Sequence, residues 1–309
     1  MSGLKLRAQT GHAEVDRALA DVVGLLEDKF PRQIRAYYLL GSWAYGDARA
    51  TSDIDVVAVL RAGTPPEAGR QARAAADEYS AEHGLSLGVF PVIEGRLHSL
   101  ARAQLGSGAL HLYGDDIRPE IEPVSPAIWA RDRMHGMYVF TGIARGLTEI
   151  SPPLGYPKPD EEFFGLTEER ARAADGSPRQ GTRDLVTGTG WYATALVAYR
   201  SGAIVLRKVD VPAAYGRYVG DEWAPFLCHL FAYCRDAWNY EIPPAPEERR
   251  FLRELCARNM EFENHFLRSY REFVIGELRS TDEGTRVLAV EALEQLPYRD
   301  AEVEKALTQ

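Results

Sequence analysis

The sequence predicts an α/β (α+β) protein in which a small sheet-containing domain precedes an all-α helical domain. Strand-type and helix-type segments alternate up to about residue 120, whereas helical patterns dominate the rest of the chain. Between the two regions, residues 119–126 are rich in proline and acidic residues, a composition typical of a linker. A chain of 309 residues is long enough for two domains.

The first domain is expected over residues 1–120, and each of its elements follows from a local pattern. Apolar residues at helical spacing predict the first helix, and short apolar runs predict strands. A segment rich in alanine, arginine and glutamate predicts a second helix, which Gly84 ends. The expected elements are a helix over 12–30, strands over 37–40 and 56–60, a helix over 67–83, and a strand over 85–93.

The centre of this domain is the stretch 39–60, where two apolar runs bracket a glycine turn. Gly41-Ser42 ends the first run, and Asp53 and Asp55 stand at alternate positions entering the second. Because side chains alternate along a strand, we expect both carboxylates on one face and Ile54 in the core. Paired carboxylates favour a hard divalent cation such as Mg²⁺, which takes oxygen ligands and substrate phosphates.

These residues carry a family resemblance. Gly41-Ser42, Gly46, Ser52 and the Asp53-x-Asp55 pair resemble the signature of polymerase β superfamily nucleotidyltransferases. The resemblance implies a small mixed sheet and transfer of a nucleoside monophosphate. It implies that the two aspartates bind two Mg²⁺ ions. It also implies that Ser42, with the amides of Gly41 and Ser42, holds the nucleotide phosphates, and that Ser52 belongs to the nucleotide site.

The third predicted strand departs from the superfamily pattern. Members of the superfamily usually carry a third carboxylate there, whereas this chain has Ser86 and Gly88 at the candidate positions. The nearest acid is Glu94, which is one candidate for the catalytic base. Two alternatives stay open: an acid from the second domain serves as the base, or the activity is weak or lost.

Beyond the linker we expect a helical domain over 125–278 and a helical tail over 279–309 that resembles a single HEAT-type hairpin. A proline-rich, irregular segment is expected over 151–178. Residues 201–208 resemble a stretch in the helical domain of aminoglycoside (streptomycin/spectinomycin) adenylyltransferases. This resemblance implies that Arg207 or Lys208 contacts the nucleotide triphosphate. The predicted helices cover 129–150, 183–201 and 247–278.

Composition limits the classes of partner. The formal net charge of −9 argues against bulk electrostatic binding to nucleic acid and suits a cationic small molecule or a metal. Three cysteines without a CxxC pair fit a reducing compartment. The start of the chain shows no signal-peptide pattern and no stretch favours a membrane span, so we expect a cytoplasmic protein.

Together these features predict a Mg²⁺-dependent enzyme that transfers AMP from ATP to a hydroxyl group. The resemblance to aminoglycoside adenylyltransferases and the acidic charge favour a cationic, aminoglycoside-like acceptor and hence a role in antibiotic resistance. Two other hypotheses stay open. The acceptor is a protein or a tRNA, as in toxin–antitoxin relatives, or the chain binds nucleotide without catalysis because the third acid is missing.

Overall fold

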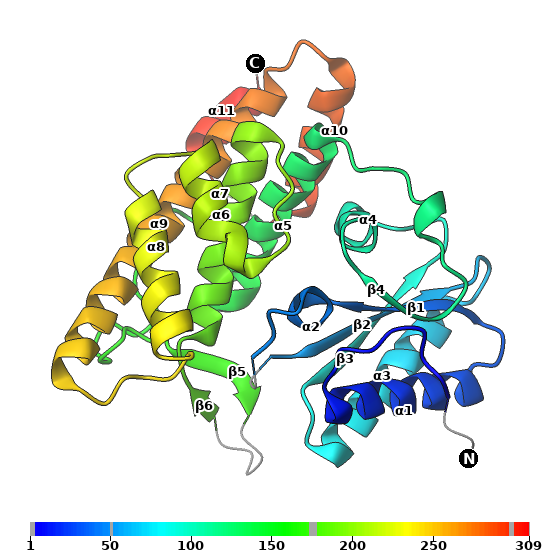
Figure 1. Cartoon of the computed structure of the whole chain (residues 1–309). Helices are drawn as coiled ribbons and strands as arrows, with labels where there is room; N and C mark the ends of the chain where they lie inside the picture. Colours follow the sequence, from blue (N-terminus) through cyan, green and yellow to red (C-terminus); the bar gives the residue numbers. More distant parts are fainter. Residues whose placement is uncertain (1–3, 50–51, 173–177, 297–299, 309) are drawn as a thin grey trace. The chain divides into compact units, whose positions relative to one another are not determined.

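The computed structural model describes residues 4–49, 52–172, 178–296 and 300–308. Its contacts divide the chain into two compact units, Met1–Ser125 and Pro126–Gln309, each with its own hydrophobic core. The first unit contains a four-stranded sheet with helices, and the second is mainly helical (Figure 1). The predicted α+β fold class is confirmed.

The first unit is built on a mixed sheet with the strand order β3-β2-β1-β4. Strand β1 pairs antiparallel with β2 and with β4, whereas β2 and β3 are parallel and joined through α3. The elements of this unit are α1 (Ala13–Lys29), β1 (Ile34–Leu40), α2 (Gly41–Tyr45), β2 (Ile54–Leu60), α3 (Pro66–His83), β3 (Leu87–Ile93), α4 (Ser99–Gly106), β4 (Leu110–Gly114) and the 3₁₀ turn η1 (Arg118–Glu120).

The two faces of β2 enter two different apolar clusters, as the period of a strand requires. Ile54 and the residues at alternate positions after it pack with α1 and α3. Val57 and Val59 instead pack with Leu105 of α4 and its surroundings. Because the strand is buried on both faces, its sequence is continuously apolar after Asp55.

The helix ends follow the expected chemistry. Pro66 opens α3, where a missing N–H costs nothing. Gly84 ends it in the left-handed conformation that glycine tolerates best, with its N–H bonded to the carbonyls of Ser80 and Ala81. The sequence placed this helix and its end correctly to within one residue. It did not predict that the Gly41-Ser42 turn continues as a short helix.

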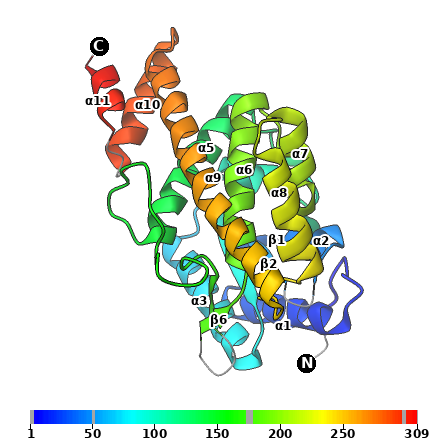
Figure 2. The same cartoon turned by 90° about the vertical axis from the view of Figure 1, so that its left-hand side faces the viewer.

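The second unit is arranged along one long helix, α9, with α10 and α11 packed near its C-terminal end (Figure 2). Helix α6 has the bounds that the sequence predicts, whereas α5 starts earlier and ends earlier than expected. The elements are α5 (Pro126–Arg145), β5 (Glu168–Arg172), β6 (Pro178–Gln180), α6 (Arg183–Ser201), η2 (Lys208–Asp210), α7 (Val211–Tyr218), α8 (Ala224–Leu230), the π-helix η3 (Phe231–Ala237), α9 (Pro246–Leu278), α10 (Glu283–Gln295) and α11 (Ala301–Leu307).

The segment after α5 is held against α9 rather than left unpacked. Arg253 lies over the ring of Phe164 at 4.0 Å, and Arg249 forms an ion pair with Glu162. The Leu154 backbone exchanges hydrogen bonds of 2.7 and 2.8 Å with the Asn264 amide. The sequence predicted an irregular segment over 151–178, of which residues 173–177 lie outside the described ranges; β5, which lies within it, pairs antiparallel with β6 at its end.

None of the helices in the described ranges is long and apolar enough to cross a lipid bilayer.

Candidate active site

The site begins where β1 passes into α2. Leu40, the last residue of β1, pairs with Asp55 of β2, so the next residue, Gly41, lies beside that carboxylate. Gly41 has φ +68°, and a Cβ atom there would come within 3.2 Å of Asp55 Oδ2. Both the backbone conformation and this close approach favour glycine. The chain turn at Gly41-Ser42 is therefore packed directly against a carboxylate.

The two aspartates occupy the N-terminal end of β2. Asp55 is on the strand face of Val57 and Val59, opposite the buried Ile54. Asp53 immediately precedes the strand and is partly buried. Anionic side chains on one short segment repel each other, so a cation or a hydrogen-bond donor beside them stabilises the arrangement.

A serine supplies one such donor. The Ser86 hydroxyl donates a hydrogen bond to Asp53 Oδ1. Ser86 is brought there by the parallel pairing of β2 with β3, because its carbonyl accepts a 2.7 Å bond from the Ile54 N–H. The sequence singled out Ser86 only as a residue that cannot replace a carboxylate. Its position opposite Asp53, which follows from the strand register, was the signal that was missed.

Ser42 and Ser52 stabilise the connection between α2 and β2. The Ser42 carbonyl accepts the N–H groups of Gly46 and Asp47 at the end of α2. The Ser52 hydroxyl accepts the Arg49 N–H at 2.9 Å. The Ser52 carbonyl accepts a 3.3 Å bond from the indole of Trp43, the residue after Ser42. These bonds fix α2 close to the start of the aspartate-bearing strand.

Glu94 does not lie with the aspartates. Gly88 pairs with Asp55, and Glu94 follows six residues later along β3, about 20 Å away at 3.3 Å per residue. There its N–H bonds to the Leu60 carbonyl, and its carboxylate pairs with Arg35 at 2.7 Å. We therefore do not retain Glu94 as a catalytic residue. The parallel register of β3 carries it to the opposite end of the sheet.

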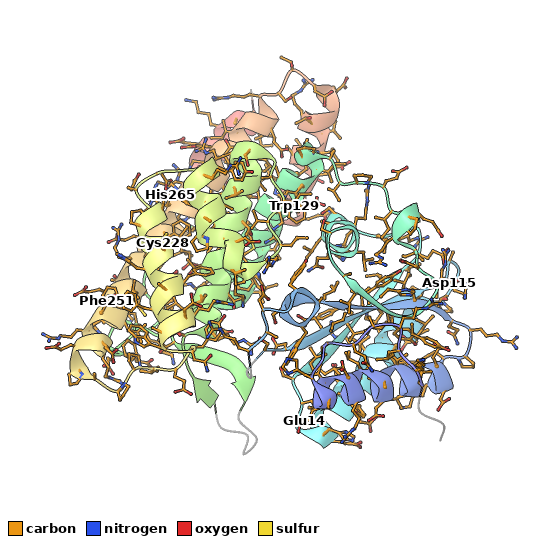
Figure 3. The ribbon with its side chains drawn as sticks, in the orientation of Figure 1. Glu14, Asp115, Trp129, Cys228, Phe251 and His265 are labelled. Carbon is orange, nitrogen blue, oxygen red and sulfur yellow. The ribbon has the colours of Figure 1, made fainter. Side chains whose placement is uncertain are left out.

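That opposite end carries an ionic cluster of its own. Arg35 also pairs with Glu120 at 2.6 Å and lies 3.6 Å from Asp115, which Figure 3 shows beyond the end of β4. Nearby, hydrogen bonds from Arg118 hold the pKa of Asp116 well below its usual range. These acids stabilise the end of the sheet and are remote from the Asp53–Asp55 pair.

Arg207 and Lys208, the predicted phosphate contacts, belong to the second unit. Arg207 lies 4.0 Å from an Asp210 carboxylate oxygen. Lys208 donates a 2.9 Å hydrogen bond to the Thr187 hydroxyl and lies over the Tyr240 ring at 5.7 Å. Within the first unit, the structure places Gly41 beside Asp55 and Ser86 on Asp53.

The carboxylates available for a metal at this site are few. In the part of the chain that the structure describes, no group of three or more His, Cys, Asp or Glu side chains is placed to hold a metal ion. Mg²⁺ commonly takes only one or two protein carboxylates and completes its shell with water and substrate phosphates. The oxygen donors of Asp53 and Asp55 suit that mode of binding.

Comparison with known proteins agrees with this geometry. Residues 19–90 match the family described as the nucleotidyltransferase domain, and this range contains both aspartates, the Gly41-Ser42 turn and Ser86. No curated protein sequence matches the chain significantly.

Solved structures give weaker similarities. The spectinomycin adenyltransferase AAD(9) of Enterococcus faecialis, solved with ATP and spectinomycin, is 10% identical, with 79% of this chain and 98% of that chain covered and a TM-score of 0.47. The toxin–antitoxin MntA–HpeT is 15% identical, with 41% and 90% covered and a TM-score of 0.26. A toxin–antitoxin structure with AMP-PNP is 14% identical, with 41% and 91% covered and a TM-score of 0.26. The family match and the mixed sheet show that this chain carries a nucleotidyltransferase domain, which contains residues 19–90.

Proposed function

We propose that the chain is a Mg²⁺-dependent enzyme that transfers AMP from ATP to a hydroxyl group and releases pyrophosphate. The observation that supports this most strongly is the contact between the Gly41-Ser42 turn and Asp55. The turn can bind phosphate through its amides and hydroxyl, and the adjacent Asp55 carboxylate can bind the metal ion that accompanies a nucleotide triphosphate. In-line transfer of a nucleotidyl group requires these two functions at one place.

Asp53 and Asp55 are the proposed metal ligands. Mg²⁺ bound there would neutralise charge on the attacking and leaving oxygens. Ser86 acts through Asp53, because its hydrogen bond to Oδ1 orients the carboxylate.

Ser42, with the amides of Gly41 and Ser42, is proposed to hold the β- and γ-phosphates. Ser52 can assist, because its hydroxyl accepts a bond from Arg49 and keeps its own O–H as a donor. In the second unit, Arg207 or Lys208 is proposed to contact the triphosphate. Lys208 carries a flexible point charge suited to a mobile anion, whereas Arg207 offers a planar fork.

The base that accepts the proton of the acceptor hydroxyl is the least constrained part of the proposal. With Glu94 about 20 Å along the strand, it is not a candidate. An acid of the helical unit is the first alternative, and slow transfer without a dedicated base is the second. A pH–rate profile separates them, since a dedicated carboxylate base gives an acidic limb that a specific substitution removes.

A cationic, aminoglycoside-like acceptor is the proposed substrate class. Its support is the net charge of −9 and the resemblance of residues 201–208 to aminoglycoside adenylyltransferases. Transfer to a protein or an RNA, and nucleotide binding without transfer, are the competing functions.

Mass spectrometry after incubation with ATP, Mg²⁺ and a panel of aminoglycosides distinguishes these functions. An acceptor whose mass increases by AMP supports the proposal, and Asp55→Asn should abolish that product. A mass increase on an added protein or RNA would instead show that the acceptor is a macromolecule and not an aminoglycoside. Tight ATP binding without any product would refute transfer and leave a binding protein.

A further inference from the structure

Helix α5 carries three arginines in the helical unit, and two of them are neutralised by buried acids. Arg131 pairs with Glu277 at 2.7 Å, and the Glu277 side chain is only 10% exposed. Arg145 pairs with Glu263 through two guanidinium nitrogens, and both side chains are below 10% exposed. These pairs show how this helix normally accommodates a buried cation.

Arg133, the third arginine, is surrounded differently. Its Nη2 reaches the Thr194 hydroxyl at 3.4 Å and the Met137 sulfur at 3.5 Å. The guanidinium lies 5.7 Å from the centre of the Trp129 ring, which is labelled on α5 in Figure 3. Its Nε is buried and has no hydrogen-bond partner within the described ranges. No carboxylate in those ranges forms an ion pair with it, in contrast to Arg131 and Arg145.

A buried guanidinium without an anion is unfavourable. The loss of hydration lowers the pKa of Arg133 to about 10, so the group still carries its charge at neutral pH. The Trp129 ring compensates for part of this loss. The Thr194 hydroxyl and the Met137 sulfur are uncharged, whereas Arg131 and Arg145 each face a carboxylate. A bound anion would supply the missing negative charge.

The neighbouring face of α6 is suited to hold a larger ligand around that anion. Thr187, Trp191 and Thr194 share one face of this helix because they are spaced by four and three residues. Trp191 is 42% exposed although it is large and apolar. Arg133 contacts one end of this face and Lys208 contacts the other, about 10 Å away at 1.5 Å per residue. An open indole thus lies between two cationic side chains.

We propose that Arg133 binds a phosphate-type oxyanion on this face of α6, beside Trp191. A planar guanidinium can bind two oxygens of such a group at once, which a single hydroxyl such as that of Thr194 cannot match. The oxyanion comes either from the triphosphate of a nucleotide or from a free polyphosphate such as pyrophosphate. The oxyanion site itself does not depend on the proposed function; only the assignment of the oxyanion to a nucleotide triphosphate does.

The test uses the full-length chain with EDTA present, so that metal-dependent binding at the aspartates does not contribute. Tripolyphosphate and ATP are titrated by calorimetry, and melting temperatures are recorded with and without each probe. In Arg133→Gln we expect the dissociation constant to rise roughly 10- to 100-fold, as for loss of charge-assisted hydrogen bonds. The melting temperature of the unliganded protein should stay equal or rise, because an unpaired buried charge has been removed.

Arg131→Gln is the matched control on the same helix. It removes the arginine partner of Glu277, which then has, among the described residues, only His135 at 3.6 Å, so it should lower the unliganded melting temperature while binding of both probes is retained. Arg133→Lys, which keeps the charge and loses the planar fork, should bind with intermediate affinity.

Weaker binding of both probes in Arg133→Gln supports a site for phosphate groups in general, and weaker binding of ATP alone supports the nucleotide as the source. The proposal is overturned if wild-type protein binds neither probe, or if Arg133→Gln binds both as wild type does. It is also overturned if Arg133→Gln lowers the unliganded melting temperature as much as Arg131→Gln does. A protein that binds tripolyphosphate but transfers no nucleotide would refute the proposed function and leave this site intact.

Discussion

Replacing Gly41 by alanine tests whether the turn positions Asp55. The added Cβ would lie 3.2 Å from Asp55 Oδ2, tighter than ordinary contact, so the carboxylate must move by a few tenths of an ångström. The positive φ of +68° adds about 1–2 kcal/mol of backbone strain. Since a misplacement of about 1 Å can cost about 100-fold in rate, we expect kcat/KM to fall roughly 10- to 100-fold.

Gly46→Ala separates the two effects. Gly46 has φ +73°, so alanine there incurs similar strain, but its Cβ would meet nothing within 4 Å. The two variants should lose similar unfolding free energy in urea titrations, whereas Gly41→Ala alone should weaken binding of Mg²⁺-ATP and lower the rate of AMP transfer. Equal binding and equal rates in the two variants would refute a role of the turn in positioning Asp55.

Three further predictions concern single groups. Ser86→Ala should lower the rate about tenfold or less and raise the Mg²⁺ concentration needed for half-maximal activity. Ser86→Thr keeps the hydroxyl and should restore both values. An unchanged Mg²⁺ requirement in Ser86→Ala would contradict this role of Ser86. Arg145→Gln should cost about 3–5 kcal/mol of unfolding free energy in urea, because the buried Glu263 carboxylate loses its cation and keeps, within the described ranges, only the Tyr192 hydroxyl; a cost below 1 kcal/mol would refute the importance of the pair. Burial lowers the pKa of His265 although a neighbouring aspartate raises it, so the folded chain binds fewer protons than the unfolded chain near pH 6. Stability should therefore fall as pH drops from about 6.5, and this slope, followed by urea unfolding, should flatten in His265→Gln.

Much of the first unit could be predicted because its signals are local. The period of the apolar residues and the glycine at the end of α3 depend on a few neighbouring positions, and α3 was placed to within one residue. The two aspartates were proposed from a local pattern in the same way. Alternation along a strand suggested their common face, and the structure places Asp55 opposite the buried Ile54.

The features that were missed depend on pairing between distant segments. Glu94 was a candidate base because it is the acid nearest the third strand in sequence, but the register of β3 with β2 fixes its distance from Asp55. The same register places Ser86 on Asp53. In the second unit, the arginines that hold the segment after α5 come from α9, some ninety residues later. Such contacts are not encoded in any local pattern.

The strand register also determines what kind of metal site this unit can form. It puts a serine, rather than an acid, against Asp53, and it puts Gly88 opposite Asp55. If Asp53 and Asp55 are the protein ligands, as proposed, the remaining ligands of Mg²⁺ would come from water and from the phosphates of the nucleotide. Metal and nucleotide should therefore bind as one unit, each raising the affinity of the other by the same factor. A site of this composition would hold its metal when a nucleotide is present and release it with the products.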